Sequence, residues 1–361
     1  MSNRNAPSSA SRSWSMAELQ DLAQASESQI ESWIEAGYIE PLKRGGAAQG
    51  SDRRFSFEAA ERCVELGGRG FQRRICVVNQ KGGVGKTTTA FTLAAALADH
   101  GRRVLAVALD AQANLTTSFG FDPDMLELTS ADLLTREDVA AEDVILETNI
   151  EGVHAIPADI KLCAVETKIQ DVLMRERILH TKLQSLYDCY HYVIFDCPPN
   201  LSRITINALV ASQEVIVPVE TQSYSIKAIS DLTNTFTLLK SKMGHDLLVW
   251  LLPTKVDRRM RLACDILDAL DEAFRGRLLD PIHIDSNLVR APLVCEPVTR
   301  AYPGSRSAIE YGRMARYFTL PDTDRERWMG LTLAQRRAVL ETASARAPKD
   351  GGEATEQARS A

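Results

Sequence analysis

The sequence lacks the features of membrane-spanning and exported proteins. Its 361 residues contain no run of about 18 apolar residues, so no transmembrane helix is predicted. The first residues, MSNRNAPSSASRSWS, have no apolar core of the kind that a signal peptide needs. We therefore expect a cytoplasmic protein that does not enter a membrane. A chain of this length is expected to hold roughly two domains.

Recognisable metal and disulfide motifs are also missing. The seven cysteines are scattered and form no C-x-x-C pair, which argues against zinc ribbons and redox dithiols. Buried, reduced thiols are the expectation. The six histidines show no metal-ligand spacing. Because the net charge is −6, any contact with DNA must come from a local basic patch rather than from bulk charge.

What the sequence does contain is a glycine-rich loop, VVNQKGGVGKTTT, over residues 77–89. An apolar run at 74–78 predicts a strand before it, and residues 88–100 predict a helix after it. Strand, glycine loop and helix are the context of a phosphate-binding loop, in which backbone N–H groups approach the phosphates closely. Lys86 would reach the β- and γ-phosphates, and the Thr87 hydroxyl would coordinate Mg²⁺. The other predicted cradle residues are Gly82, Gly83, Val84, Gly85 and Thr88.

The loop departs from the strict phosphate-loop pattern at Gln80, where that pattern has glycine, and Lys81 follows it. Two lysines are more than one phosphate cradle needs, so Lys81 is a candidate for contact with a nucleotide held by a partner chain. The alternative is a solvated lysine on a loop.

The run KGGVGKT resembles the deviant Walker A motif of the ParA/MinD family of P-loop ATPases. The resemblance spans residues 74–318. It implies ATP and Mg²⁺ as cofactors and a homodimer that sandwiches the nucleotides. It also implies that Lys81 acts catalytically together with Lys86, by reaching the phosphates bound to the other subunit.

Residues 71–330 alternate between apolar runs and helical stretches, which predicts an α/β fold. Continuous apolar runs are typical of buried parallel strands, so we expect a doubly wound, mostly parallel sheet of the P-loop NTPase class. A small all-α winged or helix-turn-helix domain would precede it. The expected domains are a disordered tail at 1–13, a helix-turn-helix domain at 14–73, the ATPase domain at 74–330, and a helix with a disordered tail at 331–361. The predicted strands are 75–78, 104–109, 192–195, 214–219 and 247–252.

Two aspartates follow predicted strands. Asp110 lies in LDAQAN, where the family has D-x-D-P-Q-x-N, so the resemblance implies that Asp110 orients or activates the attacking water. Ala108 and Ala111 replace the family's first acid and its proline. The alternative for Asp110 is a residue that caps the following turn. Asp196 ends the apolar run VIFD, a Walker B pattern whose carboxylate holds Mg²⁺.

The segment PTKVDRRMR follows the last predicted strand. In the resembled family an equivalent strand end borders adenine, which makes Thr254 and Asp257 candidate nucleotide contacts. Family members bind DNA without sequence preference through basic surface residues. The expected counterparts here are Arg258, Arg259 and Arg261, the alternative being an ordinary solvated face.

The N-terminal segment predicts two short helices, at 16–25 and 27–36, capped by Ser15 and Ser26 and ended by Gly37. It resembles the winged DNA-binding modules of MerR-like regulators and the operator-binding extension of larger plasmid ParA proteins. Arg53 and Arg54, in the basic stretch that follows, are candidate DNA contacts. However, three glutamates, at 27, 31 and 35, are poor groove-facing residues, so a dimerisation or adaptor module is the alternative.

The sequence thus predicts a partition ATPase with a weak intrinsic rate. Its ATP-bound dimer would bind DNA of the nucleoid, and a ParB-type centromere-binding partner would stimulate hydrolysis. The N-terminal module would also allow it to bind operator DNA and repress its own operon. One alternative is a sequence-specific repressor with nucleotide as an allosteric ligand, and another is a cargo-positioning ATPase of the same family. Residues after 330 are too poor in large apolar side chains for a membrane anchor, which argues against the MinD branch.

Overall fold

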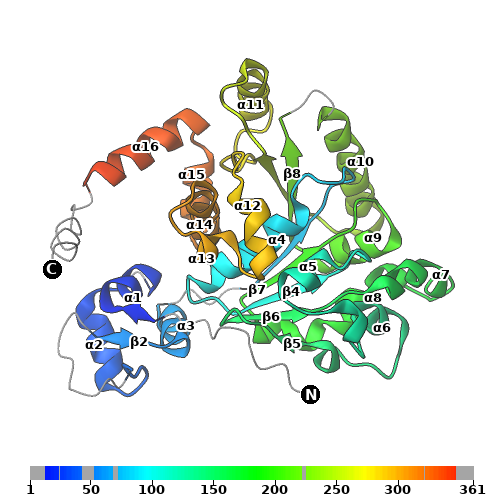
Figure 1. Ribbon diagram of the computed structural model, residues 1–361, viewed down its shortest axis with the longest axis horizontal. Coiled ribbons are helices and arrows are strands. Elements are labelled where there is room, and N and C mark those ends of the chain that lie inside the picture. Colours follow the sequence, from blue (N-terminus) through cyan, green and yellow to red (C-terminus); the bar gives the residue numbers. More distant parts are fainter. Residues whose placement is uncertain are drawn as a thin grey trace, which may run out of the picture.

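The computed structural model describes residues 13–23, 25–42, 53–67, 72–221, 225–320 and 322–346. Its centre is a sheet in the order β5-β6-β4-β7-β3-β8-β9, with β5 antiparallel to β6 and the other neighbours parallel (Figure 1). The strands are Arg73–Val77 (β3), Val104–Ala108 (β4), Leu146–Glu147 (β5), Val153–Ile156 (β6), Tyr192–Asp196 (β7), Glu214–Glu220 (β8) and Leu248–Thr254 (β9).

The predicted mostly parallel α/β sheet is confirmed, and all five predicted strands are present within two residues of their expected bounds. Two strands of this sheet were missed. β5 is only two residues long, and β6 has the sequence VHAI, in which His154 interrupts the apolar run. His154 is half-buried, and its Nδ1 lies 2.7 Å from the Tyr190 hydroxyl, a long-range contact that local sequence does not reveal.

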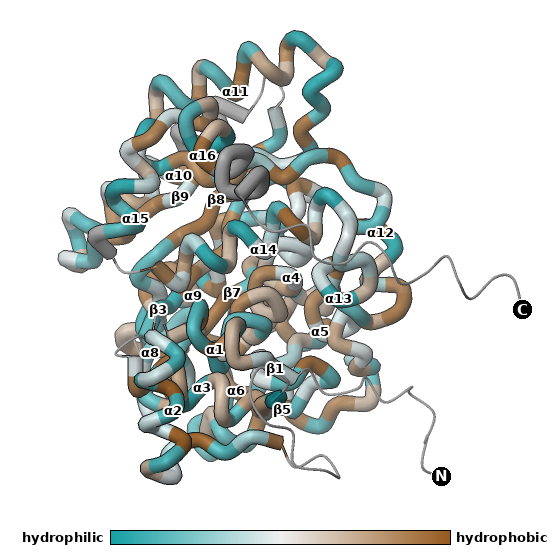
Figure 2. Tube along the Cα trace, turned by 90° about the vertical axis from the view of Figure 1, so that its left-hand side faces the viewer, coloured by the Kyte–Doolittle hydropathy of each residue, from teal (hydrophilic) through white to brown (hydrophobic). Residues whose placement is uncertain are grey.

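Helices cover both faces of this sheet. α4 (Lys86–Ala98) packs against α14 (Arg306–Thr319) over one face, and α9 (Arg203–Ala211) packs on β3 from the other (Figures 1 and 2). α4 begins two residues before its predicted start, because Gly85 caps it and Lys86 belongs to its first turn. The remaining helices of this region are α5 (Asn114–Ser118), α6 (Ser130–Thr135), α7 (Val165–Lys168), α8 (Ile178–Lys182), α10 (Ser225–Met243), α11 (Arg261–Ala273), α12 (Asn287–Arg290) and α13 (Val298–Ala301).

The N-terminal module consists of α1 (Met16–Ala23), α2 (Glu27–Glu35) and α3 (Phe57–Leu66), joined by a short ribbon of β1 (Trp14–Ser15) and β2 (Arg54–Phe55). Both predicted caps are formed: Ser15 exchanges hydrogen bonds with Glu18, and Ser26 with Gln29. α1 ends at residue 23 rather than 25. The loop expected to form the wing, residues 43–52, lies outside the described residues.

This module is packed onto the sheet domain rather than tethered to it. The indole of Trp14 donates to the Asp99 carbonyl at 3.4 Å, and Arg103 pairs with Glu61 of α3 at 2.8 Å. Apolar side chains of α1 and α3 continue into the core of the sheet domain. The two parts therefore pack against each other, and the domain boundary expected near residue 73 stays a prediction.

The C-terminal helices α15 (Asp322–Met329) and α16 (Leu333–Arg346) are held by two buried arginines. Arg325 pairs with Glu214 at 2.8 Å, and Arg336 donates to the Leu278 carbonyl at 2.8 Å and to Asp280 at 3.2 Å. No helix among the described residues is long and apolar enough to cross a bilayer. Cysteine burial was only partly predicted, since Cys163 and Cys189 are exposed whereas Cys63, Cys76 and Cys197 are buried.

Candidate functional site

The carboxyl ends of β3, β4, β7 and β9 surround a cavity of about 530 Å³, and the glycine-rich loop forms part of its wall. The cavity collects most of the predicted nucleotide-site residues. They are Gly82, Gly83, Val84, Gly85, Lys86, Thr87, Thr88, Asp110 and Thr254. Parallel strands bring their carboxyl ends to the same edge of a sheet, so residues scattered over 170 positions meet at one place.

The loop geometry explains its glycines. Gly83 and Gly85 have φ angles of +73° and +95°, a left-handed backbone that side-chain-bearing residues rarely adopt. Asn79 fixes the entry to the loop: its amide donates to the Pro218 carbonyl at 2.6 Å and its Oδ1 accepts from the Lys81 N–H at 3.0 Å. Such a loop presents backbone N–H groups to an anion at the start of α4.

Lys86 is buried at the first turn of α4, and its ammonium donates to the Lys81 carbonyl at 3.1 Å. Burial lowers the pKa of Lys86, while the nearby carboxylates of Asp196 and Asp110 oppose that shift. The lysine therefore lies between the phosphate loop and two acids, where a cation can bridge phosphate oxygens.

Asp196, the last residue of β7, is 1% exposed, and neither of its carboxylate oxygens has a hydrogen-bond partner. Burial raises its pKa to about 7, and Asp110 adds to the rise, while the neighbouring Thr87 hydroxyl and Lys86 counteract part of it. An unpaired buried carboxylate costs free energy unless a cation compensates it. This makes Asp196 and Thr87 the residues best placed to hold a metal ion.

Asp110 lines the cavity and also accepts the Gln112 N–H at 3.0 Å. Both interpretations of this aspartate thus have support, because it caps a turn and still faces the cavity.

Thr254 is buried beside the loop, where its hydroxyl donates to the Val84 carbonyl at 2.8 Å. Asp257 is not among the residues that line the cavity. Its carboxylate instead accepts hydrogen bonds from the Arg259 guanidinium at 2.7–3.2 Å, which lowers the pKa of Asp257 to about 2.

Several lining residues were not predicted. Tyr311 comes from α14, and its hydroxyl lies 3.0 Å from that of Thr89. Lys255 follows β9 with a φ of +52°. Both positions lie in segments that resemble the family, since Tyr311 ends PGSRSAIEY and Lys255 belongs to PTKVDRRMR, but neither residue was assigned to the site from the sequence. Gln112 and Asn114 likewise belong to the LDAQAN motif already singled out. The other unpredicted lining residues are Pro199, Ile282, His283, Ile284, Asp285, Leu288 and Val289.

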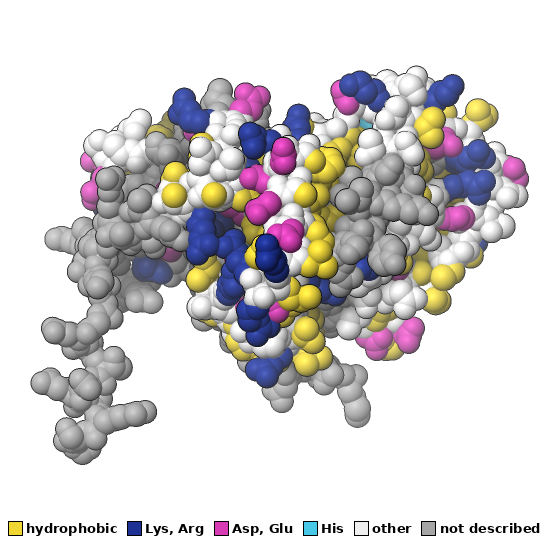
Figure 3. Space-filling model, turned by 90° about the horizontal axis from the view of Figure 1, so that it is seen from above, with side chains coloured by type: hydrophobic (Ala, Val, Ile, Leu, Met, Phe, Trp, Pro, Cys, Tyr) yellow, Lys and Arg dark blue, Asp and Glu magenta, His cyan; other side chains and the backbone are white. Residues whose placement is uncertain are grey.

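The predicted DNA contacts fall into two groups. Arg53 forms an ion pair with Glu31, and Arg54 donates to the Ser13 carbonyl at 2.6 Å, so both are bound within the N-terminal module. Arg258, Arg259 and Arg261 are exposed at the start of α11. Arg258 also lines a hollow of about 560 Å³ with three further arginines and two acids, Arg306, Arg313, Arg337, Asp280 and Glu310. Figure 3 shows Lys and Arg side chains, interspersed with Asp and Glu side chains, on the face seen from above.

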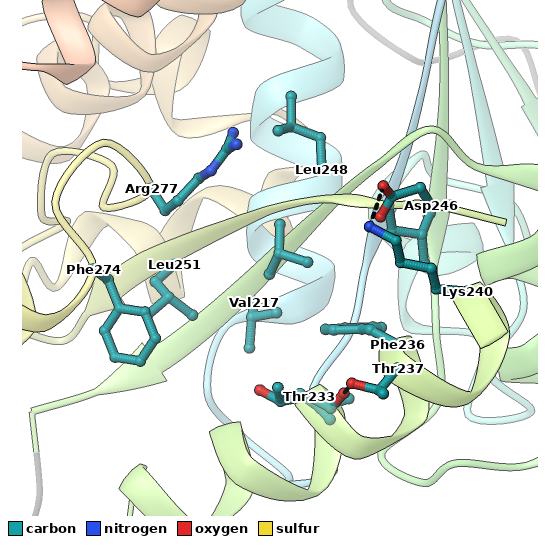
Figure 4. Close-up of a pocket in the computed structure, with 13 residues that line it drawn as sticks. Val217, Thr233, Phe236, Thr237, Lys240, Asp246, Leu248, Leu251, Phe274 and Arg277 are labelled. Carbon is teal, nitrogen blue, oxygen red and sulfur yellow. Dashed lines mark hydrogen bonds and ion pairs between the residues drawn. The ribbon is translucent and has the colours of Figure 1, made fainter.

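A separate cavity of about 310 Å³ lies between α10 and β9, with an ion pair of 2.7 Å between Lys240 and Asp246 at its edge (Figure 4). Its walls are mainly apolar and include none of the predicted site residues.

One cluster with metal-ligand spacing exists that the sequence did not indicate: Glu61, Glu65 and His191 bring ligand atoms within 4.8 Å of one another. Glu61 is paired with Arg103, and the His191 Nδ1 accepts the Arg103 N–H at 3.0 Å. Through these contacts with Arg103, the cluster attaches α3 to the sheet domain.

Comparison with known proteins agrees with the geometry. A family model described as "AAA domain" matches residues 72–249. The sporulation initiation inhibitor protein Soj of Bacillus subtilis is 36% identical over 245 residues, which cover 67% of this chain and 96% of Soj. The chromosome partitioning protein ParA of Caulobacter vibrioides is 30% identical over 259 residues, which cover 70% of this chain and 96% of that protein.

Solved structures give the same result. Cobyrinic acid a,c-diamide synthase from Mycobacterium smegmatis, with a bound ATP analogue and magnesium, matches with a TM-score of 0.59 and 32% identity over 68% of this chain and 94% of that one. The cell division ATPase MinD of Pyrococcus furiosus matches with a TM-score of 0.55 and 28% identity, and the match covers 68% of this chain and 98% of that one. The chain therefore belongs to the ParA/MinD family of deviant Walker A P-loop ATPases.

Proposed function

We propose that this protein is a ParA-type partition ATPase that uses ATP and Mg²⁺ to switch between a monomer and a DNA-binding dimer. The observation that carries the proposal is the pairing of a phosphate loop with the unpartnered, buried carboxylate of Asp196. The relatives named for chromosome partitioning support a role in DNA segregation, and those solved with an ATP analogue and magnesium support the cofactors.

The site fits a magnesium ion. Carboxylate and hydroxyl oxygens are the ligands that Mg²⁺ takes from proteins. Asp196 and Thr87 supply them side by side, and the buried carboxylate has no protein cation in hydrogen-bond contact. When bound with ATP, the ion would supply positive charge against the phosphate oxygens.

The remaining roles belong to side chains. Lys86 holds the phosphates from the start of α4, and Asp110 orients the attacking water from the end of β4. Lys81, on the exposed part of the loop, reaches the phosphates bound to a second subunit. Because phosphoryl transfer depends on positioning and charge, a site completed only on dimerisation gives a weak intrinsic rate.

The dimer would bind nucleoid DNA without sequence preference through the basic face at α11 and α14. Arg313 supports this choice, since it is exposed and has no ion-pair partner among the residues that the structure describes. A ParB-type centromere-binding partner would then stimulate hydrolysis and release the DNA. A cargo-positioning relative would use the same cycle with a different partner.

The repressor alternative receives less support. Arg53 and Arg54 make their contacts inside the N-terminal module, where Glu31 neutralises the charge of Arg53. We therefore assign the module a structural or adaptor role, with operator binding as the second possibility.

The test is binding of the full chain to random-sequence DNA with ATP, ADP or no nucleotide. We expect tight binding with ATP only, and a loss with Lys86→Ala. Arg313→Gln should weaken ATP-dependent binding about 3- to 10-fold and reduce the salt dependence by about one phosphate contact, whereas the matched control Arg53→Gln should not. Nucleotide-independent binding that Arg53→Gln abolishes would favour the repressor instead.

A further inference from the structure

The most unusual charge arrangement next to the phosphate loop involves Glu220, at the carboxyl end of β8. Its carboxylate is 9% exposed and contacts two lysines: Lys81 donates to Oε2, and the Lys255 ammonium lies 2.9 Å from Oε1. Burial alone would raise the pKa of Glu220, but the two lysines outweigh it and the pKa is lowered. The carboxylate is therefore charged at neutral pH and bound to cations from two different loops.

The three side chains come from segments that are themselves fixed. Lys81 belongs to the phosphate loop, which Asn79 ties to the Pro218 carbonyl of β8. Lys255 directly follows Thr254, whose hydroxyl holds the Val84 carbonyl of the same loop. Glu220 thus lies where the ends of β8 and β9 meet the phosphate loop.

We propose that Glu220 is a positioning residue that holds Lys81 within its own subunit, and that this ion pair must open before Lys81 reaches a partner's phosphates. The inference rests on the proposed function, because it requires Lys81 to act across a dimer. It adds that the ATP concentration needed for dimerisation is set by competition between the Glu220 carboxylate and the phosphates for one ammonium group.

Lys255 makes that competition possible. When Lys81 leaves, a buried carboxylate without a cation would be costly. Lys255 stays beside Oε1 and keeps the charge of Glu220 compensated, which lowers the cost of opening. Removing Lys255 should therefore strengthen the hold on Lys81, and removing the charge of Glu220 should release it.

The two substitutions have opposite expected effects on dimerisation, measured by sedimentation velocity with Mg²⁺ and a non-hydrolysable ATP analogue. Glu220→Gln should lower the analogue concentration that gives half dimer about 10-fold, because a charge-assisted hydrogen bond is lost from the monomer only. Lys255→Met should raise it about 3-fold, since one ion pair of moderate exposure is worth about that factor. The control Asp246→Asn removes the carboxylate of an exposed ion pair whose N–O distance is similar. It should leave the analogue concentration that gives half dimer unchanged.

A second readout separates release of Lys81 from a general structural effect. In the ADP state, the Lys81 ammonium of Glu220→Gln should react several-fold faster with an acylating reagent, measured by mass spectrometry against Lys240 in the same sample. ADP affinity should stay within error of the wild type, and the thermal midpoint should fall by only a few degrees, as expected for one lost hydrogen bond of the monomer.

The variant Lys81→Ala separates a failure of the holding role of Glu220 from a failure of the trans role of Lys81. If it abolishes dimerisation while Glu220→Gln has no effect or weakens it, the holding role of Glu220 is wrong and the partition ATPase remains. If Lys81→Ala dimerises like the wild type, the trans role of Lys81 is wrong and the role of Glu220 is overturned with it.

Discussion

Two buried carboxylates on neighbouring parts of one sheet have opposite surroundings. Glu214, at the start of β8, is 3% exposed and accepts hydrogen bonds from Arg325 at 2.8 Å, from Arg73 at 2.6 Å and from the Trp250 indole at 2.5 Å. Asp196, at the end of β7, is 1% exposed and has no hydrogen-bond partner for either oxygen. Glu214 has its partners inside the chain, and removing one partner of such a buried pair is costly, whereas the unpartnered Asp196 calls for another explanation, which a bound cation would supply.

The largest expected effect concerns Asp196. Asp196→Asn should reduce ATP hydrolysis by at least about 100-fold, because removing one positioned charge from a transition-state site typically has an effect of that size. Hydrolysis is measured by phosphate release at saturating Mg²⁺, and circular dichroism checks the fold. Unchanged turnover would mean that another residue holds the metal ion.

Glu214 should behave in the opposite way. Glu214→Gln leaves the buried guanidinium of Arg325 without its counter-charge, so we expect the free energy of unfolding to fall by about 3–5 kcal/mol. Urea unfolding measures it. The exposed pair of Lys240 and Asp246 is the control, and Asp246→Asn should cost less than about 1 kcal/mol. If Glu214→Gln and Asp246→Asn lost the same free energy of unfolding, burial would not explain a difference between the two ion pairs.

A smaller effect is expected from pH. The folded-state pKa of Asp196 is raised to about 7, from an ordinary value of 3.8, so the folded chain binds more protons than the unfolded chain between these values. Metal-free stability contributed by this group should therefore fall as pH rises from about 4 to about 7, by a few kcal/mol at most. Asp196→Asn should remove that part of the pH dependence. Parallel curves for the two proteins in urea unfolding between pH 5 and 8 would contradict the assignment.

The comparison also explains what could be predicted from sequence. The phosphate loop and the strand ends at Asp110 and Asp196 carry local motifs, and parallel pairing then brings them together. Nine of the twenty residues that line the nucleotide cavity were predicted in this way. Tyr311 and Lys255 reach the same cavity through tertiary packing, so their segments PGSRSAIEY and PTKVDRRMR did not by themselves assign them to the site.

Charge partners were the least predictable feature. Arg53, Arg54 and Arg259 look alike in a basic stretch, yet Arg53 and Arg259 are paired with carboxylates and Arg54 binds the Ser13 carbonyl. The missed strand β6 and the partners of Glu214 likewise depend on residues up to 141 positions away. Periodicity and motifs identify elements and strand ends, whereas neutralisation of a charge is decided by the fold.

The most direct test of the account is the dependence of ATP affinity on Mg²⁺, measured by calorimetry for the wild type and Asp196→Asn. If the unpartnered carboxylate is a metal site, Mg²⁺ should tighten ATP binding to the wild type by at least about 10-fold, equivalent to about 1.4 kcal/mol, and have little effect on the variant. An equal gain from Mg²⁺ in both proteins would contradict the central claim that Asp196 is kept unpaired to hold the ion.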